Sequence, residues 1–111
     1  ARKESASDSG SKYIALRRSK DNGKTWESSQ FIYDDGDVKD GSNLGNVIVD
    51  KQTKTIFVIF TFCPHSCSVS ETKMIKSVDS GMTWSKPVNL SSQLGNFVFA
   101  PGPGYGIQVI L

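Results

Sequence analysis

Few residues in this sequence have the type and spacing to do chemistry, and they stand in short polar segments. Asp8 lies in the Ser-rich stretch "SASDSGS", and Arg2 precedes it by six positions. A carboxylate can act as a general acid or base, and a guanidinium suits an anionic ligand because it stays charged and presents a planar fork of donors. Taken alone, "SDSG" favours an ordinary loop aspartate.

Two cysteines form a second candidate group. Cys63 and Cys67 enclose "PHS", in which His65 is the only histidine of the sequence. A zinc or redox site would need further Cys or His ligands, so we expect neither a metal nor a cofactor. A disulfide across three intervening residues is geometrically possible, and the sequence leaves this pairing open.

The composition is that of a packed protein. Hydrophobic residues make up 37% of the 111 positions and charged residues 22%, with 13 basic and 11 acidic side chains giving a net charge of +2. The basic residues are dispersed, which does not favour a nucleic-acid partner. No apolar stretch approaches the roughly 20 residues that cross a bilayer. The chain starts without Met or a signal-like segment and stops in "GIQVIL", so we expect a fragment of a longer protein.

Short apolar runs alternate with turn residues, which predicts an all-β fold. No segment shows a sustained helical period, and "KQTK" (51–54) fits a hairpin between two of the runs. The expected strands are "YIALRR" (13–18), "FIY" (31–33), "NVIVD" (46–50), "TIFVIFTF" (55–62), "TKMIKS" (72–77), "PVNLS" (87–91) and part of "FVFAPGPGYGIQVIL" (97–111).

One motif, S-x-D-x-G-x-T-W, occurs twice, as "SKDNGKTW" (19–26) and "SVDSGMTW" (77–84), 58 positions apart. Each copy follows a strand that ends in a basic residue and Ser, and each precedes another strand. The repeating unit is therefore about four strands with one marked turn, which suggests propeller blades. We expect the end of one blade at roughly 1–40, a second blade at 41–95 and the start of a third at 96–111.

Each residue type in this motif, the Asp-box, has a local structural role. Asp accepts hydrogen bonds from nearby backbone N–H groups, Gly supplies a positive φ, Ser and Thr tie the two arms, and Trp packs between blade sheets. A calcium loop would need alternating acidic ligands and a closing Glu, which "DNG" lacks. The residues assigned to this structural role are Ser19, Asp21, Gly23, Thr25, Trp26, Ser77, Asp79, Gly81, Thr83 and Trp84.

Three further segments resemble the sialidase family. "ARKESASDSGSKYIALRRS" resembles the segment in which a pocket Arg precedes the acid/base Asp, and "DGSNLGNVIVD" resembles the loop and strand that begin the next blade. "FAPGPGYGIQ" is similar to the signature F-A-x-G-P-G-x-G-I-Q. The animal lysosomal sialidases are the most similar branch, because "CPHSC" and the sequon "NLS" also resemble segments of these enzymes.

This resemblance implies an all-β, six-bladed β-propeller, of which the chain holds about two four-stranded blades. It implies an exo-α-sialidase acting on sialylated glycoproteins, oligosaccharides and gangliosides, with Asp8 as acid/base and Arg2 in the substrate pocket. Asn43 would contact the sugar, although "NLG" replaces the usual "NP" or "DP", and a turn-forming Asn is the alternative. Asn89 would be glycosylated if the chain enters the secretory route. Tyr105 does not match the family's nucleophile.

By the same resemblance, the nucleophilic Tyr, its Glu and the Arg triad would lie outside these 111 residues, so we expect the fragment alone to be inactive. The resemblance also implies the lysosomal lumen or membrane, and a complex with a protective carboxypeptidase and β-galactosidase. Two alternatives remain open. The first is a non-catalytic Asp-box propeller that binds proteins or glycans, and the second is a β-sandwich in which the repeats are coincidental turns.

Overall fold

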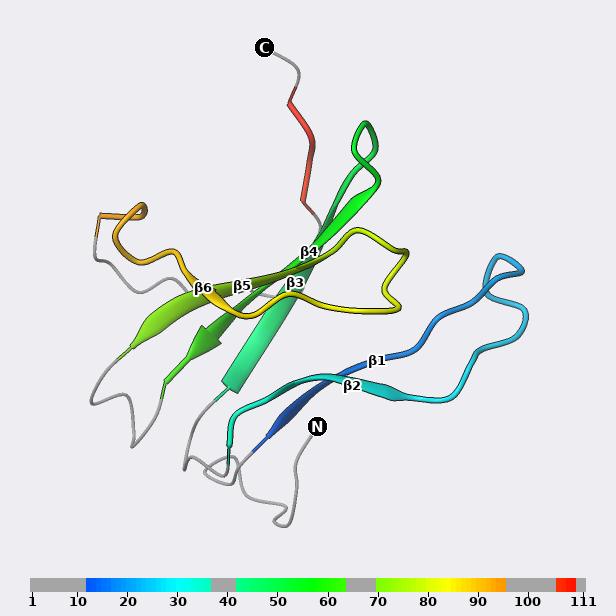
Figure 1. Ribbon diagram of the computed structural model, residues 1–111, viewed down its shortest axis with the longest axis horizontal. Coiled ribbons are helices and arrows are strands. Elements are labelled where there is room, and N and C mark those ends of the chain that lie inside the picture. Colours follow the sequence, from blue (N-terminus) through cyan, green and yellow to red (C-terminus); the bar gives the residue numbers. More distant parts are fainter. Residues whose placement is uncertain (1–11, 37–41, 64–69, 96–105, 110–111) are drawn as a thin grey trace.

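The computed structural model describes residues 12–36, 42–63, 70–95 and 106–109. Throughout these ranges the regular elements are β-strands that pair with their neighbours in sequence. Two of them form an antiparallel pair and four form a larger antiparallel sheet, in the order β3-β4-β5-β6 (Figure 1). The strands are β1 (Tyr13–Leu16), β2 (Gln30–Asp34), β3 (Ser42–Asp50), β4 (Thr55–Phe62), β5 (Glu71–Ser77) and β6 (Val88–Asn89).

The apolar pattern predicts the bounds of β4 more accurately than those of the other strands. β4 covers the expected range 55–62, and its Val58 and Phe60 are buried. β3 begins at Ser42, before the expected range 46–50. Its start was missed because the first four residues contain a single apolar side chain, that of Leu44. A register shift between Asn43 and Gly45 accommodates this polar start.

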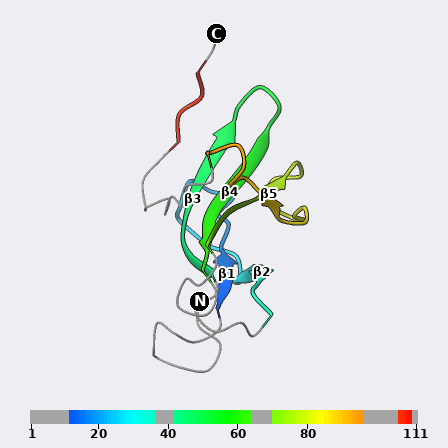
Figure 2. The ribbon, with the colours of Figure 1, turned by 90° about the vertical axis from the view of Figure 1, so that its left-hand side faces the viewer.

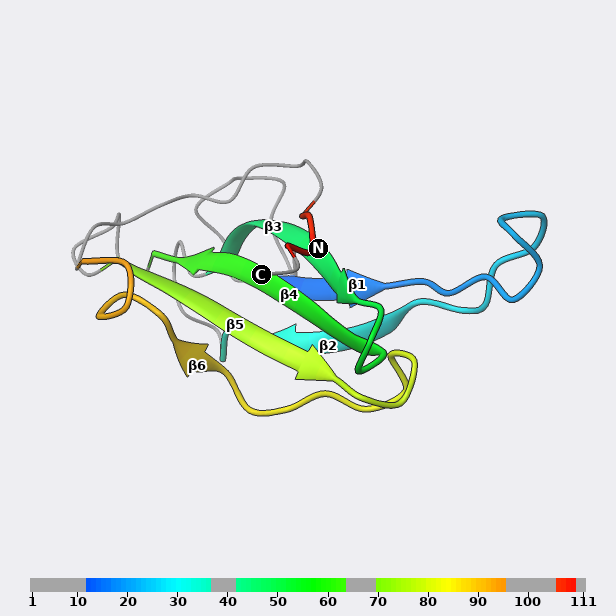
Figure 3. The same cartoon turned by 90° about the horizontal axis from the view of Figure 1, so that it is seen from above.

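The hydrophobic core lies between the two sheets. Val58 and Phe60 of β4 and Ile75 of β5 form its fully buried cluster. The β1–β2 pair packs against this cluster, and the Tyr33 and Phe60 ring centroids lie 4.7 Å apart. Figures 2 and 3 show the pair beside the larger sheet. Both sheets therefore depend on one shared apolar layer, as in packed β-sheets generally. The partly buried residues around this cluster are Ile14, Ile32, Tyr33 and Trp84.

The strand ends gather at two opposite edges. Ser42 lies opposite Phe62, and Phe62 lies opposite Glu71, so β3 starts where β4 ends and β5 starts. We call this the junction edge, and it also includes Lys12 and Asp35 beside β1 and β2. The other edge, the turn edge, carries the 51–54 hairpin and both Asp-box turns (Figure 1). No helix in the described ranges is long and apolar enough to span a membrane.

Asp50 closes the hairpin between β3 and β4 at the turn edge. Its carboxylate accepts hydrogen bonds from the Gln52 N–H at 2.9 Å and the Thr53 hydroxyl at 2.6 Å. These bonds, the one from the Thr53 hydroxyl first, lower the pKa of Asp50. The Gln108 side-chain amide also donates to Asp50 at 2.8 Å, which holds the 106–109 segment against this hairpin.

Candidate functional site

The junction edge is the candidate site because the sequence segments with the proposed chemistry lead into it. Lys12 lies four positions after Asp8, and Ser42 directly precedes Asn43. Both Lys12 and Ser42 are buried, with 8% and 3% of their surfaces exposed. The two strand starts are therefore fixed inside the protein rather than in solvent.

Asp35 connects these two strand starts. Its Oδ2 atom accepts hydrogen bonds from the Lys12 N–H at 2.7 Å and the Ser42 N–H at 3.4 Å. The Asp35 N–H in turn donates to the Lys12 carbonyl oxygen at 3.3 Å. Because Asp35 is itself buried, this carboxylate replaces water as the partner of two backbone donors. Because its partners Lys12 and Ser42 lie 23 and 7 positions away, no local sequence pattern identified Asp35 as part of this site.

The predicted site residues differ in how much of each the structure describes. Arg2 and Asp8 lie outside the described residues, so their roles stay predictions. Asn43 is the second residue of β3, where its backbone is the register partner of Thr61 at the junction edge. Its side chain lies outside the described part of the structure, and its contact with a sugar also stays a prediction.

A half-buried tyrosine and a cavity border the junction edge. Burial raises the pKa of the Tyr33 hydroxyl, and the negative charge of Asp35 adds to this shift, so Tyr33 stays neutral at physiological pH. A cavity of about 380 Å³ lies between β1 and β3, with Lys12 and Ser42 in its lining. Its other lining residues are mainly aliphatic, which suits packing better than recognition of a hydrophilic sugar.

The first Asp-box turn is a closed set of local hydrogen bonds. The Asp21 carboxylate accepts the Thr25 N–H at 2.8 Å, the Thr25 hydroxyl at 2.5 Å and the Ser19 hydroxyl at 2.8 Å. The Ser19 hydroxyl oxygen accepts the Gly23 N–H at 2.8 Å. Asn22 and Gly23 adopt positive φ values of 57° and 86°. The turn thus satisfies its polar groups within a few residues.

The second turn repeats this arrangement. Asp79 accepts the Thr83 N–H at 2.9 Å, the Thr83 hydroxyl at 2.5 Å and the Ser77 hydroxyl at 2.7 Å. The Gly81 N–H donates to Ser77 at 2.8 Å, and Ser80 and Gly81 have φ values of 62° and 82°. In both turns the bonds from the Thr side chain and backbone, then from Ser, lower the pKa of the central Asp to about 2.

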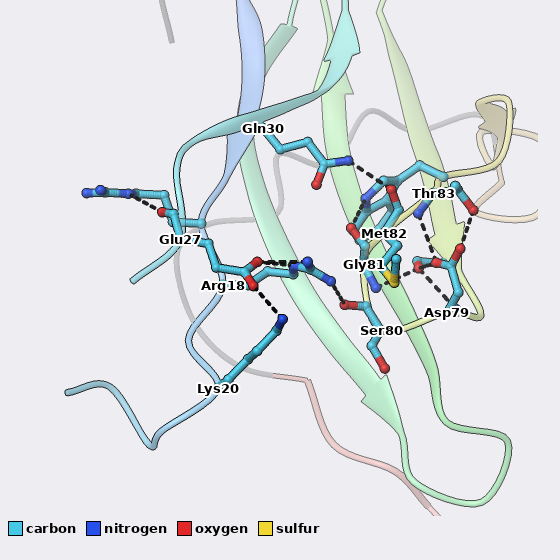
Figure 4. Close-up of polar contacts among 12 residues, drawn as sticks. Arg18, Lys20, Glu27, Gln30, Asp79, Ser80, Gly81, Met82 and Thr83 are labelled. Atoms are coloured by element: carbon cyan, nitrogen blue, oxygen red, sulfur yellow. Dashed lines mark hydrogen bonds and ion pairs between the residues drawn. The ribbon is translucent and has the colours of Figure 1, made fainter. Parts of the chain in front are cut away.

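Side chains of β2 and of the connection between β1 and β2 also bind the second Asp-box turn (Figure 4). The Arg18 guanidinium donates to the Ser80 carbonyl oxygen at 3.2 Å, and the Gln30 side-chain amide donates to the Met82 carbonyl oxygen at 3.0 Å. Glu27 orients Arg18 through an ion pair at 2.7 Å. These bonds satisfy carbonyl groups that the turn itself leaves free, and they connect the two sheets along the turn edge.

The two motif tryptophans differ in their surroundings. Trp84 packs against the core cluster between the sheets, and its indole N–H donates to the Gly81 carbonyl oxygen at 3.1 Å. Trp26 is 56% exposed, so its expected packing between two sheets is wrong for the described structure. The reason is that the hydrophobic cluster of the described residues lies between the two sheets, where Trp84 packs against it and Trp26 does not.

Comparison with known protein families identifies the family to which this chain belongs. A family model described as a BNR repeat-like domain matches residues 1–111. The chain belongs to this family. A sialidase from Bacteroides fragilis (strain YCH46) is 26% identical over 121 aligned residues, which cover 86% of this chain and 22% of the relative.

The solved structure of the Hadza microbial sialidase Hz136 is similar to this BNR repeat-like domain. It has a TM-score of 0.65 and 24% sequence identity, over 86% of this chain and 24% of that chain. This likeness confirms the predicted all-β fold with about two blades of a β-propeller, rather than a β-sandwich. The chain spans about a fifth to a quarter of the length of these two relatives.

The remaining candidate residues of this BNR repeat-like domain lie near the ends of its strands. Cys63 is buried after β4 and disulfide-bonded, and its sulfur accepts a hydrogen bond from the Ser70 hydroxyl at 3.6 Å. Cys67 and His65 lie outside the described residues. Across the ranges that are described, no three His, Cys, Asp or Glu side chains form a group that could hold a metal ion.

Asn89, the residue of the sequon, is exposed at the end of β6. Its side-chain oxygen accepts the Ser91 N–H at 2.8 Å, while the Ser91 hydroxyl oxygen accepts the Thr72 N–H at 3.1 Å. The acceptor amide is thus on the surface, but the sequon serine is engaged with β5. Glycosylation of Asn89 stays a prediction.

Proposed function

We propose that this chain is part of an exo-α-sialidase, a retaining glycoside hydrolase that removes terminal sialic acid from glycoproteins, oligosaccharides and gangliosides. The proposal draws support from the BNR repeat-like family, from the sialidase relative of Bacteroides fragilis and from the sialidase-like segments of the sequence. The observation that carries it is the 26% identity to that sialidase over 86% of the chain.

In the proposed reaction, Asp8 is the acid/base. It donates a proton to the departing glycosidic oxygen and later removes a proton from the attacking water. Arg2 supplies positive charge to the anionic sugar. Asn43 contacts the hydroxyl or N-acetyl side of the sugar. This division gives the acid/base and part of the pocket to the present chain.

The remaining machinery is proposed to lie elsewhere in a longer protein. A Tyr assisted by a Glu attacks the anomeric carbon, and an Arg triad binds the sugar carboxylate, so the first half-reaction forms a glycosyl-tyrosine bond as the aglycone leaves. A neutral tyrosine approaches a centre beside a carboxylate with less repulsion than a carboxylate nucleophile would, which explains why sialidases depart from the two-carboxylate scheme. The 111-residue chain alone is then inactive.

The proposal extends to the cellular setting. Similarity of "CPHSC" and "NLS" to animal lysosomal sialidases supports a lysosomal lumenal or membrane-associated enzyme that reaches the lysosome by the secretory route. The same similarity supports a complex with a protective carboxypeptidase and β-galactosidase. Glycosylation at Asn89 belongs to this part of the proposal, since the modification requires the secretory route.

The test compares two substrates in the full-length protein. One is a sialyl oligosaccharide, whose sugar leaving group needs a proton, and the other is an aryl sialoside whose strongly acidic phenol needs none. Asp8→Asn should lower kcat/KM for the oligosaccharide by about 10²- to 10⁴-fold and for the aryl sialoside by less than about tenfold. Asp37→Asn removes a carboxylate from another acidic segment and should leave both values unchanged.

The contrary outcomes are separable. If Asp8→Asn affects neither substrate, Asp8 is a loop residue and the assignment of the acid/base is wrong. If the wild-type protein cleaves neither substrate, a non-catalytic Asp-box propeller that binds proteins or glycans becomes the better account, because the two turns serve such a protein equally well.

A further inference from the structure

We propose that Asp35 is a positioning residue for this reaction, and this inference rests on the proposed function. Its carboxylate fixes two backbone points, the N–H of Lys12 and the N–H of Ser42. The first point lies four positions after Asp8, and the second directly precedes Asn43. One buried side chain therefore sets where both segments leave the sheets.

The geometry suits this role. Lys12 and Asp35 are 23 positions apart in sequence, yet two hydrogen bonds join them. The Lys12 N–H donates to the Asp35 carboxylate, and the Asp35 N–H donates to the Lys12 carbonyl oxygen at 3.3 Å. The bond from Ser42 then joins the larger sheet to this pair. A charged acceptor makes hydrogen bonds roughly twice as strong as a neutral one, so a carboxylate is well suited to hold two donors at once.

Because the junction is buried, water cannot easily replace the Asp35 carboxylate as the hydrogen-bond acceptor. Asp35, Lys12 and Ser42 expose only 5%, 8% and 3% of their surfaces, so water has little access to the two N–H groups. Removal of the carboxylate would leave these donors without their acceptor and would let the two strand starts move apart. A misplacement of about 1 Å at a reacting group can lower a rate by about 10²-fold.

Asp35 acts through the backbone rather than on the substrate. Its Oδ2 atom receives the two backbone donors, and the residue is almost wholly enclosed by protein. A loosened Asp8 would deliver its proton poorly, and this defect affects only those substrates whose leaving group requires the proton. The expected signature is therefore a selective loss that depends on the leaving group, which general destabilisation would not produce.

The test uses Asp35→Ala and Asp35→Asn in the full-length protein with the two sialosides described above. Asp35→Ala should lower kcat/KM for the oligosaccharide by about 10- to 100-fold and for the aryl sialoside by less than about threefold. Asp35→Asn should recover part of this loss, because its amide oxygen still accepts from the two N–H groups without the negative charge. The folded fraction of each variant is measured by circular dichroism.

Asp50→Ala is the matched control. Asp50 is a carboxylate that also accepts backbone N–H groups, but it lies at the turn edge, far from the junction. This variant should leave the ratio of the two kcat/KM values unchanged, even where it lowers stability.

Three results would overturn the inference. Equal losses on both substrates, in proportion to the folded fraction, would make Asp35 purely structural. If Asp35→Ala does not fold, Asp35→Asn decides, and the absence of a selective loss of about threefold or more would contradict the role. If the wild-type protein cleaves neither substrate while the variants fold normally, the proposed function fails and the positioning role fails with it.

Discussion

The two Asp-box turns share the hydrogen bonds of their Asp, Ser and Thr residues but have different surroundings. In both copies the central Asp binds Thr and Ser in the same pattern, and the same two positions adopt positive φ values. Gly81 and Trp84 are packed between the two sheets, whereas Gly23 and Trp26 are exposed. The comparison shows that the motif specifies its own conformation, while burial depends on the neighbouring sheet.

Of all the paired substitutions, those of the two tryptophans should differ most in the unfolding free energy that they remove. Trp84→Ala removes a ring that packs on the core and bonds to Gly81, so we expect a loss of about 3 kcal/mol in unfolding free energy. Trp26→Ala removes an exposed ring and should cost less than about 1 kcal/mol. Urea unfolding of the chain, followed by circular dichroism, measures both. Equal losses would contradict the difference in burial.

A smaller difference should separate the two glycines. An added Cβ imposes a left-handed penalty of about 1–2 kcal/mol at either position. At Gly81 it would also lie 3.3 Å from Leu16 Cδ2 and 3.5 Å from Arg18 Cδ, whereas at Gly23 its nearest neighbour is a ring atom of Trp26 at 3.8 Å. We therefore expect Gly81→Ala to be the more destabilising by about 1 kcal/mol.

Gly36→Ala provides the control for this measurement. Gly36 has a φ of 72°, and an added Cβ would have no neighbour within 4 Å among the residues that the structure describes, so this variant reports the backbone penalty. Gly23→Ala should match it in urea unfolding. If Gly81→Ala loses no more unfolding free energy than Gly36→Ala, the Leu16 and Arg18 side chains move aside without an energetic cost, and the second turn is not tightly packed.

No difference should separate the two aspartates. Each has a pKa of about 2 against an ordinary value of 3.8, so its stabilising effect is complete above about pH 4 and is lost as the pH falls toward 2. Asp21→Asn and Asp79→Asn should therefore lower the urea midpoint at pH 7 by similar amounts. Both deficits should shrink at pH 2.5. An effect confined to one variant would show that the shared bonds do not dominate.

The sequence predicted the features that depend on neighbours in the chain. The range of β4 follows from a run of apolar residues, and the turns follow from a motif whose partners lie within four positions. The start of β3 was missed because Ser42 and Gly45 give no apolar signal. The exposure of Trp26 was missed because an identical motif cannot encode which sheet lies beside it.

The site was predicted only in part. Asp35 is one of four aspartates in "DDGDVKDG", and no sequence pattern distinguishes it from the other three. Its bond to Lys12 spans 23 positions. Such a contact depends on how two sheets meet, which no local pattern records. The roles of Asp8 and Arg2 came from resemblance, and these residues lie outside the described structure.

The difference in sequence separation between the two edges implies an order of folding. The bonds inside each Asp-box turn join residues at most four positions apart, whereas the Lys12–Asp35 bond at the junction and the Arg18–Ser80 bond between the sheets span 23 and 62. Closing a short loop loses less chain entropy, so each turn can start its own hairpin before distant segments meet. We expect the chain to fold from the turn edge toward the junction edge, which makes the proposed site the last part to assemble.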